Sequence, residues 1–111
     1  FRAAGLRVHL ETSGAHPLSG TWDWITLSPK KFKAPLSPIL SQAHELKVVI
    51  HHPSDLEWAE HYAAQMPTEC ILYLQPEWEK RERVTPLIID YLKAHPQWRL
   101  SLQIHKYINV P

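Results

Sequence analysis

The residues best suited to chemistry are polar side chains that end or follow short, strand-like runs. The last of these clusters, Gln103, His105 and Lys106, stands at the end of a run over residues 99–103. An amide, an imidazole and an ammonium group can together bind a ligand with hydrogen-bond donors and a carboxylate. The tail beyond them is apolar and ends on Pro111, so we expect it to be docked with its carboxylate close to His105.

Earlier strand-like runs end in the same way. Their polar ends are Glu11, Thr12 and Ser13, then Ser28 and Lys30, then His51 and His52, then Gln75 and Pro76. In a parallel sheet the carboxyl ends of the strands share one edge, where α/β folds bind ligands. Any one polar end is weak evidence, because loops are usually polar, but together they predict a ligand site at this carboxyl edge.

The elements that must position these residues alternate along the chain. Strand-like runs cover residues 6–10, 24–27, 46–50, 71–74 and 99–103, and helical patterns cover 38–45, 54–65 and 80–95. Ser54 and Glu57 have the spacing of a capping box, and Pro86 suggests that the third helix becomes regular near Thr85. Alternating strands and helices predict an α/β fold, a parallel sheet with flanking helices, in a single domain over residues 1–111. Apolar runs such as 48–50 suit strands covered on both faces.

Composition excludes several classes of protein. Twelve basic and eleven acidic residues leave a formal charge of +1, so the chain lacks the excess that draws proteins to nucleic acid. No apolar stretch approaches the about 20 residues of a membrane span. Cys70 is the single cysteine; it excludes an internal disulfide and predicts a cytoplasmic protein with a buried structural thiol.

Histidines and tryptophans offer weaker signals. His51 and His52 are adjacent, so on a strand they would face opposite ways, and their spacing matches no zinc pattern. We therefore expect surface histidines at the carboxyl edge and no metal site. Trp58 lies on the apolar stripe of its helix and is expected to belong to the core.

Five motifs occur in a fixed order: Glu-Thr-Ser-Gly (11–14), Ser-Pro-Lys (28–30), Glu-Leu-Lys (45–47), Leu-Gln-Pro (74–76) and Gln-x-His-Lys (103–106) before the final proline. Over nearly all 111 residues this set resembles the C-terminal half of the 7-carboxy-7-deazaguanine synthase family. The resemblance implies the C-terminal part of a shortened (β/α) radical S-adenosylmethionine barrel. It also implies a lyase of queuosine biosynthesis that converts 6-carboxy-5,6,7,8-tetrahydropterin to 7-carboxy-7-deazaguanine, using S-adenosylmethionine, a 4Fe–4S cluster and Mg²⁺.

The resemblance assigns residues to both ligands. For S-adenosylmethionine these are Ser28 and Lys30 (ribose and carboxylate), Glu11, Thr12 and Ser13 (methionyl part), and Gln75 and Pro76 (adenine). For the small pterin-derived substrate they are His105 and the Pro111 carboxylate, with Gln103 and Lys106 as neighbours. A Ser-Pro turn, an ordinary loop and a proline-capped strand end remain the alternatives for the cofactor residues.

The chain departs from the family in one respect that bears on activity. The cluster needs three cysteines in a CxxxCxxC-like pattern, and only one cysteine is present. Residues 1–5 read as the end of a helix, which indicates the C-terminal part of a longer protein. The resemblance implies that the cluster and Mg²⁺ ligands lie upstream of Phe1 and that this fragment is inactive. Without the first barrel strands, an exposed sheet edge and apolar face would make the isolated chain poorly soluble or a homodimer. A glycyl-radical-enzyme activase fragment and a non-catalytic α/β ligand-binding module are the alternatives.

Overall fold

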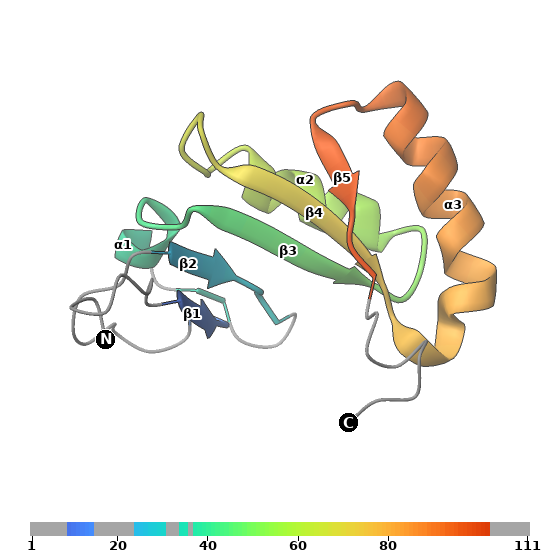
Figure 1. Cartoon of the computed structure of the whole chain (residues 1–111), viewed down its shortest axis with the longest axis horizontal. Helices are drawn as coiled ribbons and strands as arrows, with labels where there is room; N and C mark the ends of the chain where they lie inside the picture. Colours follow the sequence, from blue (N-terminus) through green and yellow to red (C-terminus); the bar gives the residue numbers. More distant parts are fainter. Residues whose placement is uncertain (1–8, 15–23, 31–33, 36, 103–111) are drawn as a thin grey trace, which may run out of the picture.

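The computed structural model describes residues 9–14, 24–30, 34–35 and 37–102. Its elements are β1 (His9–Thr12), β2 (Trp24–Leu27), α1 (Ser37–Leu40), β3 (Glu45–Ile50), α2 (Asp55–Ala63), β4 (Ile71–Pro76), η2 (Trp78–Lys80), α3 (Arg81–Ala94) and β5 (Trp98–Leu100). The strands form one parallel sheet in the order β1-β2-β3-β4-β5 (Figure 1). The predicted α/β fold with a parallel sheet is therefore confirmed.

The two faces of this sheet differ sharply. In β3, Leu46, Val48 and Ile50 are buried, whereas the alternate residues are partly exposed. The buried face packs against all three α-helices in a core that contains Leu27, Ile39, Leu40, Leu46, Val48, Ile50, Ala59, Tyr62, Leu74, Val84, Ile88 and Trp98. Each fully buried Leu or Ile contributes about 1.5–3 kcal/mol.

Among the described elements, the helices thus cover one face only. The prediction of strands covered on both faces holds for residues 25–27 and 74–76, where successive residues are all buried, and fails for β3, where burial alternates. Sequential strand order with crossovers of one hand puts every connecting helix on the same side of a sheet. Burial accordingly alternates along β3, whereas the last three residues of β4 are all buried.

The strand boundaries change how the polar ends are placed. Glu11 and Thr12 are the last residues of β1 rather than residues of the loop after it, and Gln75 and Pro76 close β4. Cys70 immediately precedes β4 instead of lying within it. The predicted first helix is shorter than expected, because Glu45 pairs with Ile71 and opens β3.

The start of α2 is stabilised differently from the predicted capping box. Ser54 has helical backbone angles and its side chain makes no capping hydrogen bond, so that prediction is wrong. The Oδ2 atom of Asp55 instead accepts the main-chain N–H groups of His51 and His52 at 2.8 and 3.1 Å. A buried carboxylate therefore fixes the turn between β3 and α2.

The third helix begins before Pro86. Glu77 Oε2 accepts the Lys80 N–H at 3.1 Å, and α3 then runs from Arg81 with Pro86 inside it. A proline in a helix removes one main-chain hydrogen bond. The buried side chains Val84 and Ile88 supply packing that offsets this loss, so the prediction of a start near Thr85 is wrong. No helix in the described part of the chain is long and apolar enough to cross a membrane.

Candidate functional site

The sheet face opposite the core is mainly polar, although Val49 and Ile71 also belong to it and Thr26 on it is buried. Glu11, Thr26 and Glu45 stand in one row across β1, β2 and β3, and Lys47, Tyr73 and Arg99 stand in a second row across β3, β4 and β5. These residues face away from the buried row of β3 and β4 because side chains alternate along a strand. The described part of this face is therefore mainly polar, where the sequence predicted an apolar one.

Two contacts connect this polar face across strands. Thr26 Oγ1 donates a hydrogen bond to Glu45 Oε2 at 2.8 Å, and Lys47 Nζ lies 2.5 Å from Glu11 Oε1. Glu11, which sequence reasoning assigned to the ligand's ammonium group, is thus already paired with a cation. The only indication of this pairing in the sequence is that Glu45 and Lys47, two residues apart on β3, point to the same face of the sheet.

The ends of β1 and β2 meet at the carboxyl edge. The Ser28 N–H donates to the Thr12 carbonyl at 2.7 Å, and the Gly14 N–H donates to Thr12 Oγ1 at 3.0 Å. Gly14 has φ of +77°, where a side chain would be strained. The structure therefore brings Thr12 and Ser28 together, with the Thr12 hydroxyl supporting the turn that carries the partly buried Ser13.

A cavity of about 310 Å³ opens beside Ser28. It is lined by Ser28, Pro29, Lys30, Val49, His51 and Trp58, from the ends of β2 and β3 and from α2. We call it the carboxyl-edge cavity. A hydroxyl and an ammonium group share this cavity with an imidazole and an indole, a combination that suits a ligand with both hydroxyl and carboxylate groups.

Sequence reasoning found half of this combination. Ser28 and Lys30 were predicted to bind a ligand, whereas His51 was predicted to lie at the carboxyl edge as a rim or surface residue and Trp58 to belong to the core. Trp58 does pack against the core, but it is only partly buried and also reaches the cavity. The available signal for His51 was its position directly after β3, the same signal that identified Ser28.

Gln75 and Pro76 are buried at the end of β4. Ser101 Oγ donates to Gln75 Oε1 at 3.2 Å, which engages the amide oxygen. β3 separates β4 from β2, and neither residue lines the carboxyl-edge cavity. Gln103, His105, Lys106 and Pro111 lie outside the described residues, and their roles stay predictions.

In the described part of the chain, the side chains that could bind a metal ion lie far apart. Over those residues, no three His, Cys, Asp or Glu side chains come close enough to hold a metal ion. Burial, followed by the charge of Glu45, raises the pKa of the Cys70 thiol to about 11, so at neutral pH the thiolate that binds metals is disfavoured.

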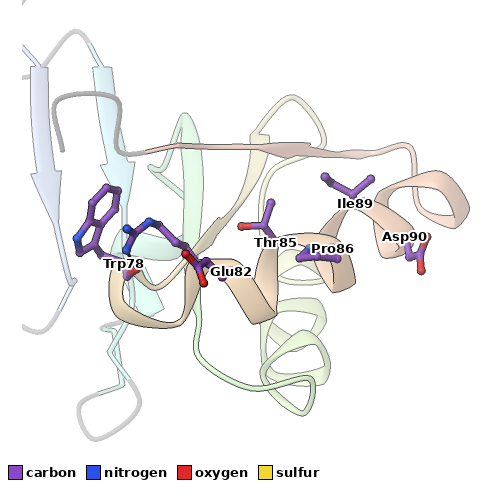
Figure 2. A pocket seen from close by; sticks show the side chains of 7 residues that line it. Trp78, Glu82, Thr85, Pro86, Ile89 and Asp90 are labelled. Atoms are coloured by element: carbon purple, nitrogen blue, oxygen red, sulfur yellow. Dashed lines mark hydrogen bonds between the residues drawn. The ribbon is translucent and has the colours of Figure 1, made fainter. Parts of the chain in front are cut away.

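A larger hollow of about 780 Å³ lies along η2 and α3, lined by residues such as Trp78, Glu82, Pro86 and Ile89 (Figure 2). Its most distinctive contact is the Arg81 guanidinium, 3.8 Å from the centre of the Trp78 ring. Most of its lining comes from a single helix. The carboxyl-edge cavity is smaller but combines groups from three elements, which makes it the better candidate for a ligand site.

Known proteins resemble the chain over its whole length. A 7-carboxy-7-deazaguanine synthase of Flavobacterium psychrophilum is 52% identical over 111 residues, which are 100% of this chain and 53% of the relative. A protein of the same name from Synechocystis is 54% identical over 106 residues, 96% of this chain and 50% of the relative. The crystal structure of QueE from Escherichia coli matches with a TM-score of 0.79 and 31% identity, over 92% of this chain and 47% of that one. The chain thus spans about half the length of these relatives, and no family model matches it.

Proposed function

We propose that this chain, a homologue of the 7-carboxy-7-deazaguanine synthases over about half of their length, forms one side of the ligand sites of such an enzyme. The reaction would convert 6-carboxy-5,6,7,8-tetrahydropterin to 7-carboxy-7-deazaguanine by radical S-adenosylmethionine chemistry. Residues 1–111 would be one portion of a partial barrel, with its polar face and carboxyl edge turned toward the ligands.

The observation that supports the cofactor assignment is the carboxyl-edge cavity. Its donor set suits S-adenosylmethionine: the Lys30 ammonium can bind the carboxylate, the Ser28 hydroxyl can bind the ribose, and Trp58 supplies an apolar wall. The Gln75 amide, oriented by Ser101, can donate to an adenine nitrogen. When bound, S-adenosylmethionine supplies the radical chemistry, and the role of this chain is to hold and orient it.

The residues of this chain do not fit the 4Fe–4S cluster. One cysteine is present, and its raised pKa opposes the thiolate that an iron ligand requires. We therefore propose that the ligands of the cluster and of Mg²⁺ belong to residues outside these 111, and that the chain alone is inactive. His105 and the Pro111 carboxylate remain the proposed contacts to the substrate.

Turnover by the complete gene product that contains this chain tests the proposal. The protein is purified without oxygen and incubated with dithionite, Mg²⁺, S-adenosylmethionine and 6-carboxy-5,6,7,8-tetrahydropterin. We expect 7-carboxy-7-deazaguanine by mass spectrometry, and much less of it with Lys30→Met. Lys93→Met, a change at an exposed lysine of α3, is the matched control. A protein that contains its cluster and cleaves S-adenosylmethionine, yet forms no product, would contradict the assigned reaction.

A further inference from the structure

His51 occupies a fixed position in the carboxyl-edge cavity. The buried Asp55 carboxylate, 1% exposed, accepts the main-chain N–H groups of His51 and His52 through Oδ2. The same oxygen lies 3.7 Å from His51 Nδ1. A buried carboxylate therefore holds the turn by two hydrogen bonds and places its negative charge beside one edge of the imidazole.

The position of Asp55 also selects the tautomer of a neutral His51. A carboxylate beside Nδ1 favours the proton on that nitrogen, so that Nε2 carries the lone pair. Nε2 is then a hydrogen-bond acceptor in a cavity whose other polar groups, Ser28 and Lys30, both offer donors. Among the other polar side chains that line the cavity, only the Ser28 hydroxyl oxygen could accept a hydrogen bond from a ligand hydroxyl.

We infer that His51 is a further ligand-contacting residue, whose Nε2 accepts a hydrogen bond from a ribose hydroxyl of the nucleoside ligand, and that Asp55 is its positioning residue. This inference rests on the proposed function, because it takes S-adenosylmethionine as the occupant of the cavity. It adds an acceptor to the donors Ser28 and Lys30, so that the site distinguishes a ribose from a deoxyribose.

His52 provides a matched control in the same turn. It is exposed, and its Nε2 lies 3.4 Å from Lys80 Nζ; it does not line the carboxyl-edge cavity. Removing its imidazole changes the same turn by the same chemistry without touching the proposed contact. His51 is itself 46% exposed, so its replacement leaves the core intact.

The experiment measures the dissociation constants of the complete gene product for S-adenosylmethionine and for its 2′-deoxy and 3′-deoxy analogues. For His51→Ala we expect the dissociation constant of S-adenosylmethionine to rise about fivefold to tenfold, the range of one lost hydrogen bond. For the analogue that lacks the contacted hydroxyl, His51→Ala should bind as the wild type does. His52→Ala should leave all three constants within about twofold.

The other outcomes overturn the inference in distinct ways. If His51→Ala binds S-adenosylmethionine with wild-type affinity, the proposed contact does not exist, and the proposed function is unaffected. An equal loss for all three ligands means that His51 supports the fold rather than the hydroxyl. Failure of the wild-type protein to bind S-adenosylmethionine at all overturns the proposed function together with the inference.

Discussion

Lys47 Nζ lies 2.5 Å from Glu11 Oε1, which joins β3 to β1 across the intervening strand β2. The side chain of Lys47 is 22% exposed and that of Glu11 is 51% exposed. A contact between strands that are not neighbours fixes the Glu11 carboxylate on the polar face of the sheet. The pair therefore neutralises the charge of Glu11, near the end of β1, and directs its carboxylate toward β3.

A double-mutant cycle of Glu11→Gln and Lys47→Met measures the strength of this pair. Because both groups are partly exposed, we expect a coupling free energy of about 0.5–1 kcal/mol in urea unfolding at low salt. It should fall toward zero in concentrated salt, which screens charges. The Lys93–Asp90 pair, 3.9 Å apart and largely exposed, should show no coupling. Equal coupling in the two pairs would refute a special role for Lys47.

Glu60 connects three elements and should be the most sensitive polar residue of the fold. Its Oε2 accepts the Tyr91 hydroxyl of α3 and, at 3.0 Å, the Trp98 Nε1–H of β5. Glu60→Ala leaves both donors without this acceptor, so we expect the free energy of unfolding to fall by about 2–3 kcal/mol. Glu57→Ala, at an exposed position of the same helix, should change it by at most about 0.5 kcal/mol. Similar values for the two variants would show that the network adds nothing.

Because of this hydrogen-bond network, we expect the free energy of unfolding to fall as the pH becomes alkaline. Burial, then the hydrogen bond and charge of Glu60, raise the pKa of the Tyr91 hydroxyl in the folded protein. Its contribution is complete below about pH 10, where a tyrosine of the unfolded chain is still neutral, and is lost as the pH rises further. Tyr91→Phe should therefore reduce the loss of stability between about pH 9 and 11, measured by urea unfolding. An unchanged pH profile would contradict this.

Cys70 should react slowly with alkylating reagents while the protein is folded. Burial and Glu45 raise the pKa of its thiol from 9.0 to about 11, so at pH 8 the thiolate is about 100-fold rarer than in the unfolded chain. The rate of reaction with iodoacetamide, followed by mass spectrometry, should rise about tenfold per pH unit up to about pH 11. The urea-unfolded protein is the control. Equal rates in both states at pH 8 would contradict the raised pKa.

Gly14 should not tolerate a side chain. Its φ is +77°, and an added Cβ would lie 2.6 Å from Pro35 Cβ and 2.8 Å from Leu27 Cδ1. We expect Gly14→Ala to lower the free energy of unfolding by about 2–4 kcal/mol, from backbone strain and overpacking together. Ser13→Ala, one residue earlier, should cost less than about 1 kcal/mol. Thermal unfolding of the two variants distinguishes these values.

Local pattern predicted the sheet well because each strand contains its own hydrophobic alternation. β2 was located at Trp24–Leu27 without error, and β3 and β4 within two residues. The helix starts could not be predicted in the same way. The turn before α2 is held by the buried Asp55 carboxylate and not by Ser54, which the local motif indicated. Pro86 is accommodated inside α3 because its neighbours Val84 and Ile88 are buried.

The site was predicted only where a residue directly follows a strand. Ser28, Lys30 and His51 were all placed at the carboxyl edge because they come soon after strands, and the structure adds Trp58 to the same cavity. Trp58 comes from α2, and its approach to Ser28 depends on how the helix packs on β3. Such a contact between distant segments has no local signature, which is also why the Lys47–Glu11 pair was missed.

The most direct test of the account is the affinity of the complete gene product for S-adenosylmethionine, measured by calorimetry for the wild type, Lys30→Met and Lys93→Met. If the carboxyl edge holds the cofactor carboxylate, Lys30→Met should raise the dissociation constant at least about tenfold, as expected for a lost charge-assisted hydrogen bond. Lys93→Met should bind like the wild type. Unchanged affinity in Lys30→Met would contradict the assignment of S-adenosylmethionine to the carboxyl-edge cavity.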